Sequence, residues 1–260
     1  PETEIYVKSR NLMGIYFAKG EIARREKCIL VEGNVDVVMM HQLGISNVVA
    51  SCGTSLTIEQ VRLIKKFTEN ITMMYDGDSA GLHATERAVP MILSEGMNVH
   101  VVPLPDGEDP DSLSRKLSRE QMLSYIADNE KDFIVWQTDR LLSEAAGDPL
   151  RKAGMINGIA DTIAQIPDAV KRSTYAEAVA QRFGIEESIL FDRIARTRRQ
   201  LQDEARRIAE RQARLSAAGN PPDAYRTVIR EPQQGDSQES SAPAGQELPE
   251  ENRILAPAER

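Results

Sequence analysis

The sequence predicts an α/β fold: an open, mainly parallel sheet flanked by helices, followed by a small helical subdomain and a disordered tail. Short apolar runs without polar–apolar alternation recur between residues 28 and 102, as in strands buried on both faces. Helical segments separate these runs, which is the pattern of βαβ units. Beyond about residue 111 the pattern turns helical, and residues 231–260 are rich in Glu, Gln, Ser and Pro.

The strands and helices of the predicted sheet follow in order. Four apolar runs are the expected strands: residues 28–31, 47–50, 71–75 and 99–102. The first intervening helix covers residues 35–43 and ends at Gly44, a residue that suits a helix C-terminus. The second begins at Thr57, where Gln60 completes a capping box. The third covers residues 79–95.

The helical region carries apolar stripes that we interpret as core. Three stripes are expected: Phe133, Ile134, Trp136, Leu141 and Leu142; then Met155, Ile156, Ile159, Ile163 and Ile166; then Phe183, Ile185, Ile189, Leu190 and Ile194. Such spacing is typical of buried helix faces rather than of a cofactor site. Residues 193–214 are rich in Arg, and a solvated helix is favoured over a nucleic-acid contact there.

Composition narrows the class of protein. A net charge of −8 is against a simple nucleic-acid coat protein, but it does not exclude an enzyme that holds divalent metals with carboxylates. Cys28 and Cys52 have no C-x-x-C partner, so no zinc ribbon or disulfide framework is expected. No apolar run approaches the ~20 residues of a membrane span, and there is no signal peptide, so we expect a soluble, cytoplasmic protein. The first residues lack an initiator Met and read as part of a longer protein.

Acidic residues follow three of the predicted strands. Glu32 comes directly after the first strand, Asp76 and Asp78 after the third, and an acidic segment, residues 106–111, after the fourth. Parallel strands end at one edge of a sheet, where ligands bind. Carboxylates gathered there would repel one another, and a divalent cation such as Mg²⁺ or Mn²⁺ removes that conflict. The alternative is that these acids only cap turns and helices, as Asp36 and Asp78 could.

Two motifs make the resemblance to a family specific. Glu32-Gly33-x-x-Asp36 and Asp76-Gly77-Asp78-x-Ala80-Gly81 resemble the signature of the Toprim family, which includes bacterial primases, topoisomerases, small nucleases and repair proteins. The resemblance implies a Toprim-type fold, an acid/base role for Glu32, and Mg²⁺ binding by Glu32, Asp76 and Asp78. Asp36 is expected to support the site or to cap its helix. The glycines are expected to let the backbone turn sharply after each strand.

The flanking segments resemble bacterial replicative primases. They are Lys8-x-Arg10-x-Leu12-x-Gly14, Val49-Ala50-Ser51-Cys52-Gly53-Thr54-Ser55-Leu56-Thr57 and Gly107-Glu108-Asp109-Pro110-Asp111-Ser112-Leu113. The resemblance implies synthesis of RNA primers from NTPs on single-stranded DNA, with a replicative DNA helicase as partner of the full protein. It adds Asp109 and Asp111 as metal ligands, and Lys8 and Arg10 as contacts to nucleotide or template phosphate. It is strong over residues 1–115, weaker to about 200, and absent beyond.

Departures from the primase pattern limit what we expect of this chain. Asn34 replaces the usual Tyr after Glu-Gly. The N-terminal zinc-binding module and the basic subdomain are not found, so zinc is expected only in that missing module, and no helicase-binding domain is recognisable. The chain alone is therefore expected to bind metal but to prime poorly or not at all.

The expected domain divisions of the chain are a lead-in segment of the polymerase core (1–27), a Toprim metal-binding domain (28–115), a helical subdomain (116–200), and an Arg-rich helix or linker with a disordered tail (201–260).

The acidic motifs are also compatible with other functions. A Toprim nuclease would use the same carboxylates to cut phosphodiesters, and a non-catalytic scaffold for replication or repair would need none of them. A topoisomerase would need a nucleophilic Tyr, for which no context is found. A haloacid-dehalogenase phosphatase would need Thr or Val where Ala80 stands.

Overall fold

A computed structural model describes residues 7–51, 55–145 and 147–217. The predicted disordered tail and Cys52 lie outside these residues. The elements up to the fifth strand are η1 (Lys8–Arg10, a 3-10 helix), β1 (Leu12–Met13), α1 (Ile15–Arg25), β2 (Cys28–Val31), α2 (Asn34–Gln42), β3 (Val48–Ser51), α3 (Ile58–Lys65), β4 (Asn70–Met73), α4 (Ser79–Ser94) and β5 (Asn98–Val101). They are followed by α5 (Pro110–Lys116), α6 (Arg119–Asn129), β6 (Lys131–Asp132), α7 (Phe133–Glu144), α8 (Pro149–Ile163), α9 (Ala169–Phe183) and α10 (Glu187–Ala217).

The sheet confirms the predicted fold class. Its six strands lie in the order β1-β3-β2-β4-β5-β6. The four central strands pair in parallel, while β1 and β6 pair antiparallel at the two edges. The predicted helix limits are also close to those observed. Thr57 caps α3 with Gln60 in a capping box, and Gly44, with φ of 86°, follows α2.

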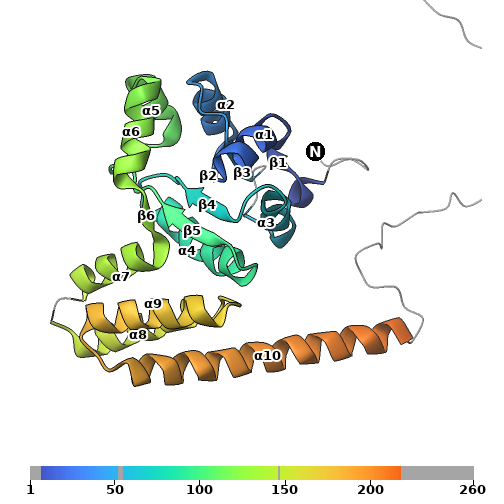
Figure 1. The fold of residues 1–260 in the computed structure, drawn as a ribbon, viewed down its shortest axis with the longest axis vertical. Helices are drawn as coiled ribbons and strands as arrows, with labels where there is room; N and C mark the ends of the chain where they lie inside the picture. Colours follow the sequence, from blue (N-terminus) through green and yellow to red (C-terminus); the bar gives the residue numbers. More distant parts are fainter. Residues whose placement is uncertain (1–6, 52–54, 146, 218–260) are drawn as a thin grey trace, which may run out of the picture. The chain divides into compact units, whose positions relative to one another are not determined.

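Both faces of the sheet are covered, as the continuous apolar runs predict. Along β2, Cys28 and Leu30 belong to one core cluster, whereas Ile29 and Val31 belong to a second. The first cluster includes side chains of α1, α3 and α4, and the second includes side chains of α2, α5 and α6. Figure 1 shows α2, α5 and α6 together on one side of the strands. Alternate residues of one strand therefore serve two separate cores.

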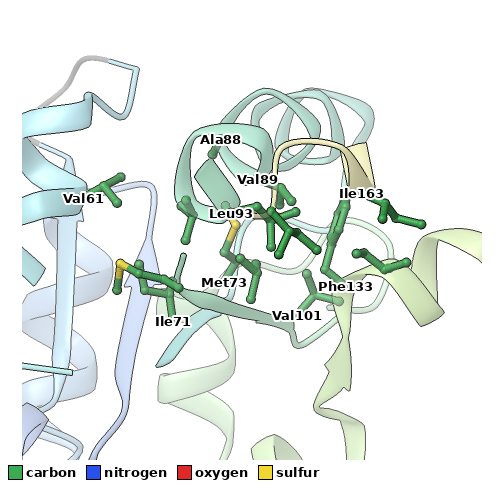
Figure 2. Close-up of a cluster of buried hydrophobic side chains, with 14 of the residues drawn as sticks. Val61, Ile71, Met73, Ala88, Val89, Leu93, Val101, Phe133 and Ile163 are labelled. Atoms are coloured by element: carbon green, nitrogen blue, oxygen red, sulfur yellow. The ribbon is translucent and has the colours of Figure 1, made fainter. Parts of the chain in front are cut away.

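The larger core joins the sheet to the helical region. Figure 2 shows Val89 and Leu93 of α4 gathered with Phe133 and Ile163, which belong to α7 and α8. Each of these four side chains is at most 4% exposed. Burial of one such side chain is worth roughly 1.5–3 kcal/mol, so this contact is a substantial part of the fold's stability.

The helical region packs on the edge of the sheet through α7 and α9. Tyr175 Oη donates a hydrogen bond to Asp132 Oδ2 at 2.5 Å, and Lys171 Nζ donates to Asn98 Oδ1 at 2.9 Å. The described residues up to Ala209 form one compact unit. The boundaries expected at 27/28, 115/116 and 200/201 stay a prediction.

One predicted helical stripe was wrong. The residues from Phe183 to Ile194 were expected to form one element, but α9 ends at Phe183 and α10 begins at Glu187. Gly184, with φ of 65°, ends α9 in a left-handed conformation. Within α10, Ile189 is 54% exposed, while Leu190 is buried.

Within the part of the chain that the structure describes, no helix has both the length and the apolar character that crossing a bilayer requires.

Candidate functional site

The candidate site lies at the carboxyl ends of β2 and β4, which are adjacent in the sheet. After β2 the chain crosses through α2 to β3 on one side, and after β3 it returns through α3 to β4 on the other side of β2. The strand order thus reverses between β2 and β4. In open α/β sheets this reversal leaves a crevice where ligands bind. Glu32 and Asp76 follow these two strands.

Glu32 is held in an acidic and partly buried position. Its Oε1 is buried and has no hydrogen-bond partner among the described residues. Burial, and then the charges of Asp76, Asp78 and Asp36, raise the pKa of Glu32 to about 6, while the charge of Arg87 opposes the rise. The charges of Asp76, Asp78 and Asp36 therefore act on Glu32.

Asp76 and Asp78 are positioned by the start of α4. Asp78 is the N-cap residue of this helix, and its Oδ1 accepts a hydrogen bond from the Gly81 amide at 2.8 Å. Burial, followed by the charges of Asp109 and Asp78, raises the pKa of Asp76. The helix cap proposed as an alternative role for Asp78 is therefore real, but it uses only one of the two carboxylate oxygens.

Glycine at position 77 is needed for a different reason from the one expected. Gly33 and Gly77 do not have positive φ values, so neither needs the left-handed turn that glycine permits. A Cβ on Gly77 would instead lie 2.3 Å from the Pro105 carbonyl oxygen. The Gly77 amide donates to the Glu108 carbonyl at 2.9 Å, so the loop after β4 lies directly against the loop after β5.

Asp36 links two helix starts. Its Oδ2 accepts from the Gly33 amide at 2.9 Å, and its Oδ1 accepts from the Asp111 amide at 3.2 Å. The residue is 6% exposed. Burial raises its pKa to about 6, with the charges of Asp76 and Asp109 adding to the rise and the two amides opposing it. Both oxygens of Asp36 are therefore already used within the protein, as its predicted capping role requires.

Of the third acidic segment, residues 106–111, Asp109 acts on the site carboxylates, whereas the Asp111 carboxylate pairs with an arginine instead. Asp109 caps α5 by accepting from the Ser112 amide at 2.6 Å, and its charge acts on both Asp36 and Asp76. The carboxylate of Asp111 instead pairs with the Arg115 guanidinium, at 2.8 and 2.9 Å. Across residues 7–51, 55–145 and 147–217, no group of three or more acidic, His or Cys side chains is already arranged to hold a metal.

Lys8 and Arg10 lie beside the start of α3. Gln60 Nε2 donates to the Lys8 carbonyl, and Thr57 Oγ1 donates to the Ser9 carbonyl. Neither basic residue lines the two cavities next to the carboxylates. Their predicted contact with phosphate stays a prediction.

Two cavities flank Tyr75, which lines both. One of about 560 Å³ also includes Asp76, Asp78, Leu104, Trp136 and Arg140. The other, of about 430 Å³, includes Glu32, Ser51, Ser55 and Arg87. The sequence analysis did not identify Arg87, Trp136 or Arg140 as site residues. A signal for Arg87 was present, because Ala84, Arg87, Ala88 and Met91 share one helical face and all line the cavity beside Glu32.

Known proteins that are similar to this chain in sequence and structure are Toprim-like proteins and DNA primases. Residues 29–114 match the family described as Toprim-like, and residues 135–188 match the DnaB-helicase binding domain of primase. The DNA primase of Clostridium acetobutylicum is 33% identical over 197 residues, which are 75% of this chain and 32% of that protein. A DNA primase domain from Pseudomonas aeruginosa is similar in structure, with a TM-score of 0.66, 28% identity, and coverage of 76% of this chain and 62% of that one.

A DnaG primase catalytic domain, solved with bound single-stranded DNA, gives a TM-score of 0.64 at 32% identity. The match covers 72% of this chain and 61% of that chain. The fold and the acidic strand ends define a Toprim-like protein. Among such proteins, the chain belongs to the bacterial DNA primase family. It spans about a third of the length of the Clostridium primase.

The match to the helicase-binding family corrects one prediction. We expected no recognisable helicase-binding domain in this chain, yet residues 135–188 match that family over most of α7, α8 and α9. Helical periodicity could not reveal it, because residues such as Ile159 and Ile163 form a core and are at most 1% exposed. A stripe of this kind shows which face a helix buries and carries no information about a partner.

Proposed function

We propose that this chain contributes the metal-binding and nucleotidyl-transfer site of an enzyme that makes RNA primers on single-stranded DNA. The observation that carries the proposal is the electrostatic coupling of Glu32, Asp76 and Asp78 at the crevice between β2 and β4. The primase relatives favour primer synthesis over cleavage of phosphodiesters by the same carboxylates.

A divalent metal, Mg²⁺ or Mn²⁺, fits the chemistry of these residues. The site offers carboxylate oxygens, which are the ligands that Mg²⁺ prefers. Glu32 has one buried oxygen without a partner among the described residues, and Asp78 uses only one oxygen to cap α4. Glu32, Asp76 and Asp78 would hold the ion, with Asp109 beside them. Asp111 could join only by leaving Arg115.

Different residues of the chain would have different roles in the reaction. When bound, the metal would neutralise charge on the attacking and leaving oxygens of a phosphoryl displacement. Asp76 and Asp78 would fix the position of the ion, and through it that of the nucleotide's phosphates, because the start of α4 and the loop after β5 hold this segment. Through the carboxylate oxygen that does not hold the ion, Glu32 would accept the proton of the attacking 3′ hydroxyl. Pyrophosphate leaves from the opposite side.

The partners of the whole protein follow from its relatives and are part of the same proposal. One structural relative was solved with bound single-stranded DNA, which supports a DNA template. The helicase-binding match over residues 135–188 supports a replicative helicase as partner of the α7–α9 region. The NTPs and the RNA primer follow from the reaction itself.

Calorimetric titration with Mn²⁺ tests the metal site. The wild-type chain is compared with Asp76→Ala, with Glu32→Gln, and with Asp128→Asn as a matched control on the exposed surface of α6. We expect saturable binding that Asp76→Ala weakens at least tenfold and that Asp128→Asn leaves unchanged.

Binding that is equally strong in Asp76→Ala would refute the metal site. Primer synthesis by the intact parent protein, with and without Asp76→Ala, then tests the reaction: loss of priming without loss of template binding is the expected result. Nicking of DNA in place of priming would favour the nuclease alternative.

A further inference from the structure

The cavity of about 430 Å³ beside Glu32 is lined by several polar residues that have no role in the proposed metal site. Besides Glu32 it is lined by Ser51 at the end of β3, by Ser55 shortly before α3, by Tyr75 after β4, and by Arg87 of α4. Residues with hydroxyl, guanidinium and carboxylate groups thus line the same cavity. The larger cavity, on the other side of Tyr75, has mainly apolar walls by comparison and contains Asp76 and Asp78.

Arg87 differs from the other arginines of this region. Arg62 pairs with Glu95 at 2.9 Å, and Arg140 pairs with Glu86 at 2.6 Å. For Arg87, the interaction found among the described residues is its charge acting on Glu32. Its side chain is exposed and lines the cavity from the middle of a well-formed helix. Among the described residues the Arg87 guanidinium has no hydrogen bond or ion pair, so its five N–H donors can bind a ligand in the cavity.

An arginine in this place suits the phosphates of a nucleotide. The planar fork of its donors matches phosphate oxygens, and such charge-assisted bonds are stronger than neutral ones. The carboxylates at the strand ends repel an anionic polyphosphate, so a cationic side chain next to them favours binding. Contacts to phosphate are also independent of the base, as an enzyme that copies a template requires.

We infer that the cavity beside Glu32 is a polyphosphate-binding site in which Arg87 contacts the phosphates of the nucleoside triphosphate. The inference rests on the proposed function and adds a binding residue to it. Ser55 lines the same cavity and can donate a hydroxyl hydrogen bond to the same group.

A simpler role for Arg87 makes a different prediction. If the guanidinium only balances the charge of Glu32, its loss changes the metal site and leaves phosphate binding as it was. If it contacts phosphate, its loss weakens nucleotide binding and leaves the affinity for the metal alone nearly unchanged.

Calorimetry on the 260-residue chain separates these roles, with ATP as the probe. ATP is titrated with Mn²⁺ present and again in EDTA, and Mn²⁺ is titrated alone. The variants are Arg87→Gln, Arg87→Lys, and Arg62→Gln as a matched control on the neighbouring helix α3. We expect Arg87→Gln to weaken ATP binding about tenfold or more, the range for hydrogen bonds between charged groups. Arg87→Lys should recover part of the loss, and Arg62→Gln should have no effect.

The inference is overturned if Arg87→Gln binds ATP as tightly as the wild type, if it loses Mn²⁺ and ATP affinity equally, or if the wild-type chain binds Mn²⁺ but no ATP. The last result would leave the proposed metal site intact. ATP binding that depends on Arg87 in EDTA, from a chain that fails to bind Mn²⁺, would support this inference while refuting the metal site.

Discussion

Replacing Gly81 by Ala tests whether the loop of Asp76 is held as tightly as the structure indicates. Gly81 lies in the first turn of α4, where Ala normally stabilises a helix by about 1 kcal/mol. A Cβ at this position would lie 2.3 Å from the Asp76 carbonyl oxygen and 3.0 Å from its amide nitrogen. Ordinary contact begins at 3.4 Å, so the backbone would have to shift by about 1.1 Å.

The obstructing atoms belong to the backbone and cannot rotate away as a side chain can. Overpacking of this kind costs about 1–3 kcal/mol. With the helix preference subtracted, we expect Gly81→Ala to lower the free energy of unfolding by up to about 2 kcal/mol. The shift also displaces Asp76, so Mn²⁺ affinity should fall in the same variant.

Urea denaturation measures the effect, with Gly20→Ala and Gly158→Ala as controls. Both of these glycines are helical, and a Cβ on either would meet nothing within 4 Å. Each control should therefore raise the free energy of unfolding by about 0.5–1 kcal/mol. A Gly81→Ala variant that is stabilised as much as the controls, with unchanged Mn²⁺ affinity, would refute the reasoning.

Two further predictions concern stability. Glu130 is partly buried, which opposes its ionisation, but hydrogen bonds from Lys27 (2.6 Å) and Thr72 (2.5 Å) hold its pKa below the usual value. The ionised Glu130 carboxylate therefore stabilises the folded state at pH values above its pKa in the unfolded chain. This stabilisation is lost as the pH falls through the lower pKa of the folded state. Urea denaturation at falling pH should show this loss in the wild type and a flatter profile in Glu130→Gln; equal slopes would contradict it. Phe133→Ala should cost about 3–5 kcal/mol, because the ring is 2% exposed and joins the sheet to α8. Leu150→Ala is the control: Leu150 is 86% exposed, so the unfolding free energy should change by less than about 0.5 kcal/mol. A similar loss of stability in both variants would show that burial does not determine the cost of the substitution.

The positions of the main elements of the sheet could be predicted from local patterns. The continuous apolar run of residues 28–31 predicted a doubly covered strand, and β2 is buried at all four positions. Thr57 and Gln60 predicted the start of α3 because capping depends only on residues three apart. The stripe from Phe183 to Ile194 failed, since apolar periodicity continued across a break that Gly184 introduces.

The candidate site was predictable in composition but not in geometry. That Glu32, Asp76 and Asp78 meet follows from parallel strands ending at one edge of the sheet. That Asp111 pairs with Arg115 depends on the direction of two side chains on α5, which strand order does not fix. The helicase-binding match was missed because a partner's surface leaves no periodic pattern.

The sequence by itself determined the four parallel strands, the helix caps and the set of acidic residues at the strand ends, because these depend on neighbours a few residues apart. The two antiparallel edge strands, β1 and β6, have only two residues each and were not predicted. Only the tertiary structure decided which side chains face which. It brought Arg87 to the cavity beside Glu32, and it placed the carbonyl groups of Pro105 and Asp76 against Gly77 and Gly81. These contacts depend on how separate loops and helices pack, which is set by the shape of the whole core rather than by local preference.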